Sequence, residues 1–456
     1  MGINEKKPNI LWIMTDQQSA NMLSCTGNQW VSTPNLDALA EESVRFDNNY
    51  CTNPVCCPSR FSLLTGMYPG DIGVRNNIYR NFSYGVPPAV VENGMGKLLR
   101  DQGYTTVYGG KQHLPFTNVV ELGFDNPTKD CRDQLADSFA QYLAEYDYSS
   151  PLCMVASFIN PHDICLMAIS DFRKYYDLDG LGNNLEVVYG DAINAVNKAK
   201  KIPEGVSEEE FYRDICPPLP DNYQPSEDEP EAISILQEQR RFKKLAREQY
   251  TDAQWRLHRW AYANLTNWVD SQIGKLLDAL KASDHWDDTL IIFTSDHGDM
   301  DASHKMEHKE NLYQEACRVP LLIKQPGKSE GRVSDLLVSN GLDLFPTILD
   351  YAGAPAPSYL RGKSLRSAVE NSTAESLRDV LVIECENGIG AVSKEFKYVL
   401  YDKGDRNEQL YNLIENPGEQ YDQSADPRYQ NVLEMFRQVI SQHQNTRPAE
   451  FICMKK

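Results

Sequence analysis

Four apolar segments of strand length, each followed by polar or charged residues, constrain the fold of this chain more than any other feature. They cover residues 9–14, 104–108, 152–159 and 289–294. The first is apolar on both faces, as strands are in the middle of a parallel sheet covered by helices. Helical patterns lie between these segments, so we expect an α/β sandwich. Ligands of such sheets bind at the carboxyl ends of the strands.

The residues that follow these strands are therefore candidates for one shared site. Asp16-Gln17 and Asp296-His297 each follow an apolar strand. Carboxylate and amide oxygens suit hard divalent cations, and a single histidine also admits Mn²⁺. These two pairs thus have the composition of a metal site. The full set expected at this edge of the sheet is Asp16, Gln17, Cys56, Arg60, Lys111, His113, His162, Asp296, His297 and Lys309.

Residues 54–66 predict a reactive thiol at the start of a helix. Pro58 suits the first helical turn, because the N–H that it lacks has no partner there in any helix. Cys56 then lies at the positive end of the helix dipole, and Arg60 lies one turn further along. A thiol, an arginine and a helix N-terminus together form a place for an anion.

The net charge of the chain is −20 at pH 7. This charge argues against nucleic acid and anionic membranes as partners, so an anionic substrate would have to meet a local cluster of cations. The sequence contains no apolar run of about 18 residues, so no membrane span is expected.

The eleven cysteines are odd in number and include no Cys-x-x-Cys pair, which favours a reducing compartment. Residues 1–7 contain no long apolar segment, so no signal peptide is expected. The sequence as given therefore predicts a cytoplasmic protein. If a leader had been trimmed from it, the same sequence would fit a periplasmic protein.

The chain is long enough for one large core with an accessory part. We expect a main domain over residues 1–360 and a smaller subdomain over 361–456, where short strands alternate with turns. Residues 170–245 are polar and rich in proline, and we expect them to cross the surface near the cleft. A long helix is expected over 246–282, because apolar residues recur there at helical spacing.

The sequence Cys56-x-Pro58-Ser59-Arg60, followed by Leu64-Thr65-Gly66, resembles the signature of the type I sulfatases. In that family a separate maturation enzyme oxidises the first cysteine to Cα-formylglycine, whose hydrate is the nucleophile. The resemblance implies an alkaline-phosphatase-like fold. Such a fold has a large mixed, mostly parallel sheet between helices and a smaller C-terminal α+β subdomain with an antiparallel sheet. The domain over 1–360 would then be the catalytic domain.

Two segments after strands resemble further motifs of this family. Gly110-Lys111-Gln112-His113 resembles its Gly-Lys-x-His motif. By this resemblance Lys111 would hold a sulfate oxygen, and His113 would act on the second hydroxyl of the hydrate. Pro161-His162 resembles its Pro-His segment, so His162 would protonate the leaving oxygen or bind sulfate.

Four other residues receive roles from the same resemblance. Lys309, ahead of Arg318-Val319-Pro320, resembles the lysine that meets the ester oxygen. Arg60 would neutralise negative charge on the sulfate together with the two lysines. Asn77 and His304 are expected to contact the substrate.

The resemblance also implies one divalent metal, bound by Asp16, Gln17, Asp296, His297 and residue 56. Sulfatases commonly carry Asp-Asp at the first position, whereas this chain has Asp16-Gln17, as choline-sulfatase-like and phosphonate-hydrolase-like relatives do. Asp296-His297, in place of Asp-Asn, is also seen within the superfamily. Ca²⁺ is the expected ion, and Mn²⁺ and Mg²⁺ stay open.

The implied reaction is the hydrolysis of a sulfate ester to an alcohol and inorganic sulfate. A small sulfated sugar is the expected substrate, because tyrosine-rich clefts with acidic rims suit hydroxyl groups. Asp16-Gln17 keeps an alternative open, a phosphonate monoester or phosphodiester hydrolase of the same superfamily. A second alternative is an anion-binding protein without catalysis, in which Cys56 stays unmodified.

Overall fold

The computed structural model describes residues 7–77, 85–173, 185–327, 330–371 and 376–446. Its centre is a seven-stranded sheet with the order β3-β4-β1-β5-β6-β2-β7. Only β6 runs antiparallel to its neighbours, so the expected mixed, mostly parallel sheet is confirmed. The strands are β1 (Asn9–Asp16), β2 (Val44–Tyr50), β3 (Thr105–Gly110), β4 (Leu152–Pro161), β5 (Thr289–Ser295), β6 (Leu321–Lys324) and β7 (Arg332–Ser339).

The four apolar segments of the sequence form β1, β3, β4 and β5, as predicted. Two strands, β2 and β7, were not predicted. Both lie toward the far edge of the sheet, and each exposes part of its residues. Their sequences therefore lack the continuous apolar run of the central strands.

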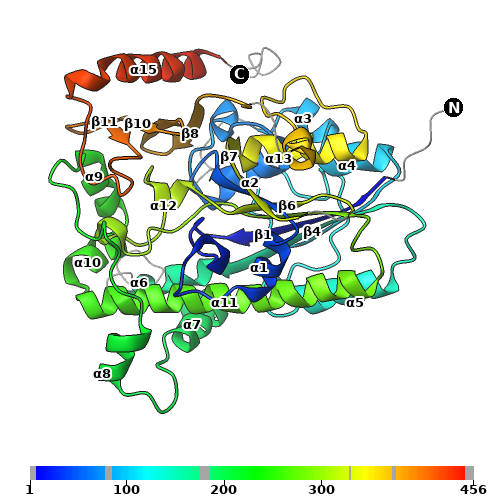
Figure 1. The fold of residues 1–456 in the computed structure, drawn as a ribbon, viewed down its shortest axis with the longest axis horizontal. Coiled ribbons are helices and arrows are strands. Elements are labelled where there is room, and N and C mark those ends of the chain that lie inside the picture. The colour runs from blue at the N-terminus through cyan, green and yellow to red at the C-terminus, as the bar shows by residue number, and fades with distance from the viewer. Residues whose placement is uncertain (1–6, 78–84, 174–184, 328–329, 372–375, 447–456) are drawn as a thin grey trace.

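Helices cover both faces of this sheet (Figure 1). Alternation along β1 divides the core: Leu11 and Ile13 pack on one side with Ile273, while Trp12 packs on the other with Phe345. Successive side chains of a strand point to opposite faces, so one strand supplies both cores. The first face carries α1 (Pro34–Ala40), α5 (Leu135–Glu145) and α11 (Asp252–Ala282), and the second carries α2 (Cys56–Thr65), α3 (Pro88–Glu92), α4 (Met95–Asp101) and α13 (Asn340–Ala352).

The prediction of one helix over 246–282 is wrong at its start, because residues of two separate helices lie in that range. The helix α10 (Arg241–Gln249) ends before it, and α11 begins at Asp252. Thr251 caps α11: its side chain accepts from the backbone N–H of Gln254, and the Gln254 side chain accepts from the backbone of Thr251. This reciprocal cap is a strong helix start, and it explains the break.

Residues 170–245, expected as a polar surface crossing, contain several helices, and residues 174–184 lie outside the described part. Phe242 and Leu245 of α10 are buried together with Trp255 of α11. The segment is thus packed onto the main helix rather than laid loosely over it. The other helices in this part of the chain are α6 (Leu166–Asp171), α7 (Leu185–Ala199), α8 (Glu208–Glu210), the π-helix 211–215 and α9 (Glu231–Gln239).

The C-terminal part contains the expected antiparallel sheet, with the order β11-β10-β9-β8, and a last helix, α15 (Gln430–Asn445), packed on it. Met306 and Tyr313, from before residue 360, belong to the same hydrophobic core as this sheet. The boundary at 360 stays a prediction, and a shared core crosses it. The strands are β8 (Leu381–Cys385), β9 (Gly388–Val392), β10 (Phe396–Tyr401) and β11 (Glu408–Asn412), and the remaining α-helices are α12 (Gln314–Cys317) and α14 (Arg366–Glu370).

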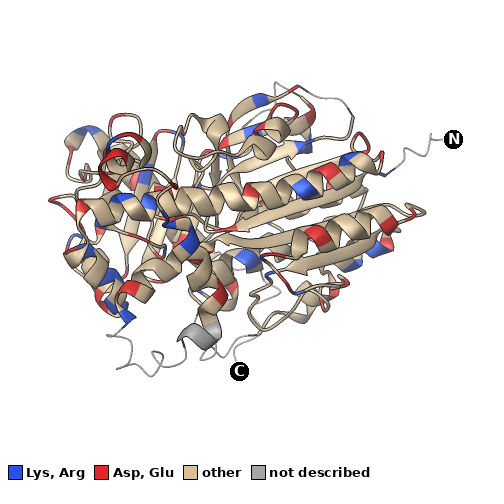
Figure 2. Cartoon of the chain, turned by 90° about the horizontal axis from the view of Figure 1, so that it is seen from below, with Lys and Arg blue, Asp and Glu red and all other residues tan. Residues whose placement is uncertain are grey.

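Within the described ranges, no helix combines the length and the apolar character needed to cross a bilayer. Seen from below, basic and acidic residues are interspersed along the helices of that face (Figure 2).

Candidate active site

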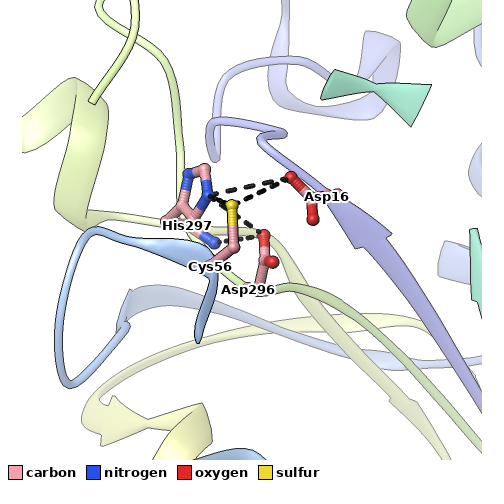
Figure 3. A group of neighbouring side chains, drawn as sticks. All are labelled: Asp16, Cys56, Asp296 and His297. Atoms are coloured by element: carbon pink, nitrogen blue, oxygen red, sulfur yellow. Dashed lines mark hydrogen bonds and ion pairs between the residues drawn. The ribbon is translucent and has the colours of Figure 1, made fainter. Parts of the chain in front are cut away.

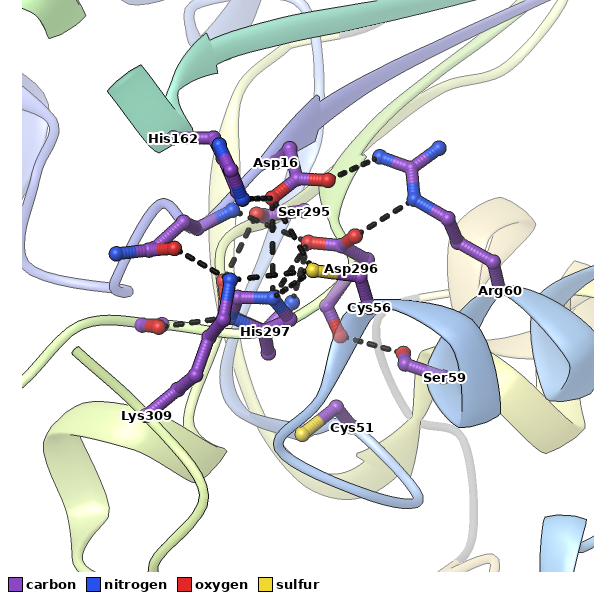
Figure 4. Close-up of polar contacts among 12 residues, drawn as sticks. Asp16, Cys51, Cys56, Ser59, Arg60, His162, Ser295, Asp296, His297 and Lys309 are labelled. Carbon is purple, nitrogen blue, oxygen red and sulfur yellow. Dashed lines mark hydrogen bonds and ion pairs between the residues drawn. The ribbon is translucent and has the colours of Figure 1, made fainter. Parts of the chain in front are cut away.

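The carboxyl ends of the central strands converge on the first turn of α2 (Figure 4). Asp16 is the last residue of β1, and Asp296 follows β5 directly. His162 follows β4, and Cys56 is the first residue of α2. Because β1 lies between β4 and β5 in the sheet, these side chains meet although up to 280 residues separate them in sequence. The structure therefore brings together the side chains at the ends of these strands, as the sequence led us to expect.

Asp16, Cys56, Asp296 and His297 form a buried group in which one potential ligand atom of each residue lies within 4.8 Å of those of the others (Figure 3). The Cys56 Sγ lies 3.1 Å from His297 Nε2 and 3.7 Å from Asp16 Oδ1. Two carboxylates, an imidazole and residue 56 have the donor chemistry that a divalent cation requires. The group therefore fits the metal site predicted from the sequence.

The orientation of His297 supports this fit. Its Nδ1 lies 2.8 Å from the carbonyl oxygen of Gly298, which can only accept a hydrogen bond. Nδ1 therefore carries a hydrogen, and Nε2 is the nitrogen that faces Asp16, Cys56 and Asp296. A histidine that binds metal through one nitrogen commonly donates from the other in this way.

Gln17, the fifth predicted metal ligand, lies beside this group and has other partners. Its Oε1 accepts from Lys309 Nζ at 2.6 Å and from Cys165 Sγ at 2.9 Å. Its Nε2 donates to Asp299 Oδ2 at 2.6 Å. The backbone of Gln17 is left-handed, with φ of 67°. Its role as a ligand stays a prediction, and its contacts show that it also holds the Lys309 ammonium.

Arg60 lies in the site, but it faces the carboxylates rather than an open space. Its Nε donates to Asp296 at 2.7 Å and its Nη2 to Asp16 at 2.9 Å, and all three side chains are 0% exposed. Its Nη1 donates to Ser157 Oγ and to the carbonyl oxygen of Lys111. The sequence assigned Arg60 to the sulfate. In the structure these bonds direct it to Asp16 and Asp296, whose orientation it holds.

Two lysines reach residue 56 or its neighbours. Lys309 Nζ lies 3.1 Å from Cys56 Sγ, and Lys111 Nζ lies 2.5 Å from Asp16 Oδ2. Burial raises the pKa of the Cys56 thiol, but the positive charges of Lys111, Lys309 and His297 outweigh burial and hold that pKa well below its usual value. Positive charge is therefore concentrated where a negatively charged group at position 56, or a bound oxyanion, would lie.

The two carboxylates differ in acidity. Burial and the charge of Asp16 raise the pKa of Asp296 to about 6. Burial and Cys56 also raise the pKa of Asp16, but Lys111, His162 and Arg60 outweigh them, so that pKa lies below its usual range. Two carboxylates this close disfavour their common ionisation, and a bound cation would favour it.

His162 and His113 both border residue 56. His162 Nε2 lies 4.0 Å from Asp16 Oδ1, and the imidazoles of His162 and His113 both interact with the Cys56 sulfur. Burial, Lys111 and Lys309 lower the pKa of His162 to about 4. The side chains of His162 and Lys111 are 21% and 13% exposed, whereas Asp16 is fully buried. The site therefore opens toward these two residues.

The two predicted substrate contacts lie differently. Asn77 Oδ1 accepts from the backbone N–H of Cys57 at 3.0 Å, so Asn77 lies at the start of α2 beside the site. His304 is buried and stacks on Tyr313, with ring centroids 4.1 Å apart. Its backbone N–H donates to Asn222. The contacts described for His304 are with these residues and not with the group around Cys56, and its role as a substrate contact stays a prediction.

Several residues of the site were not predicted. Ser59 Oγ donates to the carbonyl oxygen of Asp296, and Ser157 Oγ accepts from Arg60 at 2.7 Å. Cys165 and Asp299 hold the Gln17 amide. A polar residue inside the apolar strand 152–159 was the one available signal for Ser157, and the motif itself contained Ser59. Nothing in the sequence around Cys165 and Asp299 indicated a role in the site, because only the fold shows that both contact the Gln17 amide.

Comparison with known proteins agrees with this site. The family model described as "Sulfatase" matches residues 8–354, and a model described as "N-sulphoglucosamine sulphohydrolase, C-terminal" matches residues 302–446. The first match covers more than half of the chain. The chain therefore belongs to the sulfatase family, and it is a sulfuric ester hydrolase.

Individual relatives extend the likeness over nearly the whole chain. An N-acetylglucosamine-6-O-sulfatase of Bacteroides thetaiotaomicron is 26% identical, over 94% of this chain and 83% of its own length. The structure of a 2-O GAG sulfatase superposes with a TM-score of 0.80 at 24% identity, over 96% of this chain and 92% of that one. A phosphonate monoester hydrolase of Agrobacterium radiobacter superposes with a TM-score of 0.71 at 22% identity, over 96% and 95%. The two structural likenesses show the alkaline-phosphatase-like fold.

Proposed function

We propose that this sulfatase hydrolyses a sulfate ester of a carbohydrate, with a formylglycine hydrate at position 56 as the nucleophile. The observation that carries the proposal is the position of residue 56. It begins α2 and lies 3.1 Å from both Lys309 Nζ and His297 Nε2. Asp16 and Asp296 complete a donor group there. A nucleophile beside concentrated positive charge suits attack on an anionic ester.

The residues present would hold a divalent cation through Asp16, Asp296, His297 and residue 56, with Gln17 beside them. When bound, such an ion lowers the pKa of a neighbouring hydroxyl. Ca²⁺ is the ion we propose, and Mn²⁺ and Mg²⁺ are tested in parallel. A separate maturation enzyme would convert Cys56.

The remaining chemistry belongs to side chains of this chain. From their positions beside Asp16 and residue 56, Lys111 and Lys309 would stabilise the negative charge of the sulfate oxygens. His162 lies on the open side, where a bound anionic ester would raise its pKa, so that it would pass a proton to the departing alcohol. His113, which also borders residue 56, would then take a proton from the second hydroxyl, so that sulfate leaves.

A carbohydrate sulfate is the substrate class we propose, because a similar relative is an N-acetylglucosamine-6-O-sulfatase and a similar structure is a 2-O GAG sulfatase. The test is a comparison of kcat/KM for sulfated mono- and disaccharides with that for a simple aryl sulfate, using matured enzyme. A sugar sulfate should exceed the aryl sulfate. Equal values for all of them would contradict the substrate class.

A phosphonate monoester hydrolase is the second candidate, because Asp16-Gln17 and the fold of one solved phosphonate monoester hydrolase both allow it. The ratio of kcat/KM for a sulfate monoester and a phosphonate monoester decides between the two. The nucleophile is tested separately by mass spectrometry of the tryptic peptide with residue 56 after co-expression with a maturation enzyme. A peptide with only unmodified cysteine, and no species trapped by an aldehyde reagent, would remove the formylglycine.

A further inference from the structure

The loop that delivers Lys309 to residue 56 has an unusual backbone. Six of its non-glycine residues have positive φ, between 47° and 76°. L-residues rarely adopt this left-handed region, and they stay there only when the surrounding structure holds them. The residues are Asp301, Ala302, His304, Lys305, His308 and Glu310. The position of Lys309, between two of them, therefore depends on what holds this loop.

Glu310, the next residue, is held by three separate parts of the chain. Its backbone N–H donates to the carbonyl oxygen of Pro54 at 3.1 Å, two residues before Cys56. Its own carbonyl oxygen accepts from the Cys385 thiol of β8 at 3.2 Å. Its carboxylate accepts from Lys243 Nζ of α10 at 2.6 Å. Glu310 thus joins the nucleophile loop, the C-terminal sheet and the helices of residues 170–245.

Lys243 makes the contact that matters most for Lys309. Its Nζ also donates to the backbone carbonyl oxygen of Lys309 at 3.0 Å. The side chains of Lys243 and Glu310 are only 2% and 8% exposed, and Arg240 adds a more distant charge, 3.5 Å from Glu310. A buried lysine with a carboxylate and a carbonyl as partners has a defined position, because moving it would leave a charge unpaired.

We propose that Lys243 and Glu310 form a positioning pair that sets the Lys309 ammonium against residue 56. Lys243 holds the Lys309 backbone from one side, and Glu310 fixes the same turn against Pro54. Neither side chain is placed on the substrate, so the pair acts only through Lys309. This inference rests on the role proposed above for Lys309 in turnover.

The test is a double-mutant cycle in the matured full-length enzyme, with 4-nitrophenyl sulfate as the probe. Lys243→Met is expected to lower kcat by about 10-fold or more and to leave KM within about threefold, because it misplaces a group that acts in the transition state. Lys243→Met combined with Lys309→Met should be no slower than Lys309→Met alone, within about twofold. A pair that acts through Lys309 has nothing left to position once Lys309 is gone.

Two controls separate positioning from general damage. Lys244→Met changes the next residue of α10, whose side chain is 39% exposed and pairs with Glu238, and it should leave kcat unchanged. Lys397→Met with Glu419→Gln removes another buried ion pair, outside the site, and it should lower stability without lowering kcat. If Lys243→Met does not fold, Lys243→Met with Glu310→Gln removes both charges together and should show the same loss of kcat.

The outcomes distinguish this inference from the function on which it rests. If Lys309→Met alone leaves kcat unchanged, the proposed role of Lys309 is wrong. If Lys309→Met slows turnover but the Lys243→Met loss multiplies with it in the double variant, the positioning pair is overturned. The pair is also overturned if a folded Lys243→Met enzyme keeps the kcat of the unchanged enzyme.

Discussion

Buried charge is arranged differently in the site and in the C-terminal sheet. In the site, Arg60 and Lys111 pair with the carboxylates of Asp16 and Asp296, and Lys309 adds a third positive charge beside Cys56. In the C-terminal sheet, Lys397 of β10 forms a one-to-one ion pair with Glu419 at 2.5 Å, and each side chain is 1% exposed. A balanced buried pair needs nothing further, whereas a surplus of positive charge needs an anion.

This difference separates buried charges that serve function from buried charges that only stabilise the fold. Burial raises the pKa of the Cys56 thiol, yet the surrounding cations hold it well below its usual value. Burial lowers the pKa of Lys397, and its carboxylate partner more than restores it. Lys397 is thus neutralised by its own partner, while the site keeps a positive potential for a ligand.

The largest effect expected is the loss of turnover in Cys56→Ala. Removing the nucleophile should lower kcat by at least about 10³-fold, while thermal unfolding changes little. Cys57→Ala is the matched control: it follows directly in α2, and burial and the neighbouring Cys56 raise the pKa of its thiol to about 12. It should keep turnover. Activity retained in Cys56→Ala would end the assignment of the nucleophile.

The balanced pair should behave in the opposite way. Lys397→Met leaves the Glu419 carboxylate buried without its partner, so the free energy of unfolding should fall by about 3 kcal/mol. The same variant should keep the kcat of the unchanged enzyme. Urea unfolding and steady-state kinetics measure the two quantities. A large fall in kcat without loss of stability would mean that this pair also serves the site.

Removing the proposed cation tests whether the carboxylates of the site bind a metal ion. At an ion concentration of about 100 times Kd, binding should add about 2.7 kcal/mol to the free energy of unfolding. Thermal unfolding with Ca²⁺, Mn²⁺, Mg²⁺ or a chelator measures the effect, and Asp296→Asn should abolish it. The metal assignment is wrong if the unchanged protein unfolds at the same temperature with each of the three ions as it does with the chelator.

The smallest effect concerns His258 of α11, a buried histidine whose two ring nitrogens find no hydrogen-bond partner among the described residues. Burial and Arg259 lower its pKa to about 3. Because an unfolded histidine binds its proton near pH 6.5, this group contributes stability above that pH. The contribution is lost at about 1.4 kcal/mol per pH unit as the pH falls from 6.5 toward 3.

His258→Phe removes this titration. Urea unfolding at pH 6 and pH 5 should therefore show a shallower fall in stability for the variant than for the unchanged protein. Equal slopes in the two proteins would show that burial of His258 does not set the acid limit of stability. Activity is not the readout here, since the site contains other groups that titrate in this range.

Much of the fold could be predicted, and the errors have physical reasons. Strands buried on both faces have continuous apolar sequences, so β1, β3, β4 and β5 were predicted correctly. The outer strands β2 and β7 have mixed sequences, and packing alone makes them strands. The break before α11 depends on the side-chain cap of Thr251, which apolar periodicity does not register.

The sequence by itself determined which chemistry this protein carries. The motif around Cys56, the polar ends of four strands and the family resemblance identified the candidates for the nucleophile, the lysines, the histidines and the metal group. These signals are local, because a reaction requires particular side chains and a strand end places them at one edge of a sheet.

Only the tertiary structure decided what each group faces. It turned Arg60 toward Asp16 and Asp296, stacked His304 on Tyr313, and joined Lys309 to Lys243 of α10. Such contacts join residues far apart in the chain, and their geometry follows from packing across the whole core. No local pattern of residues encodes it.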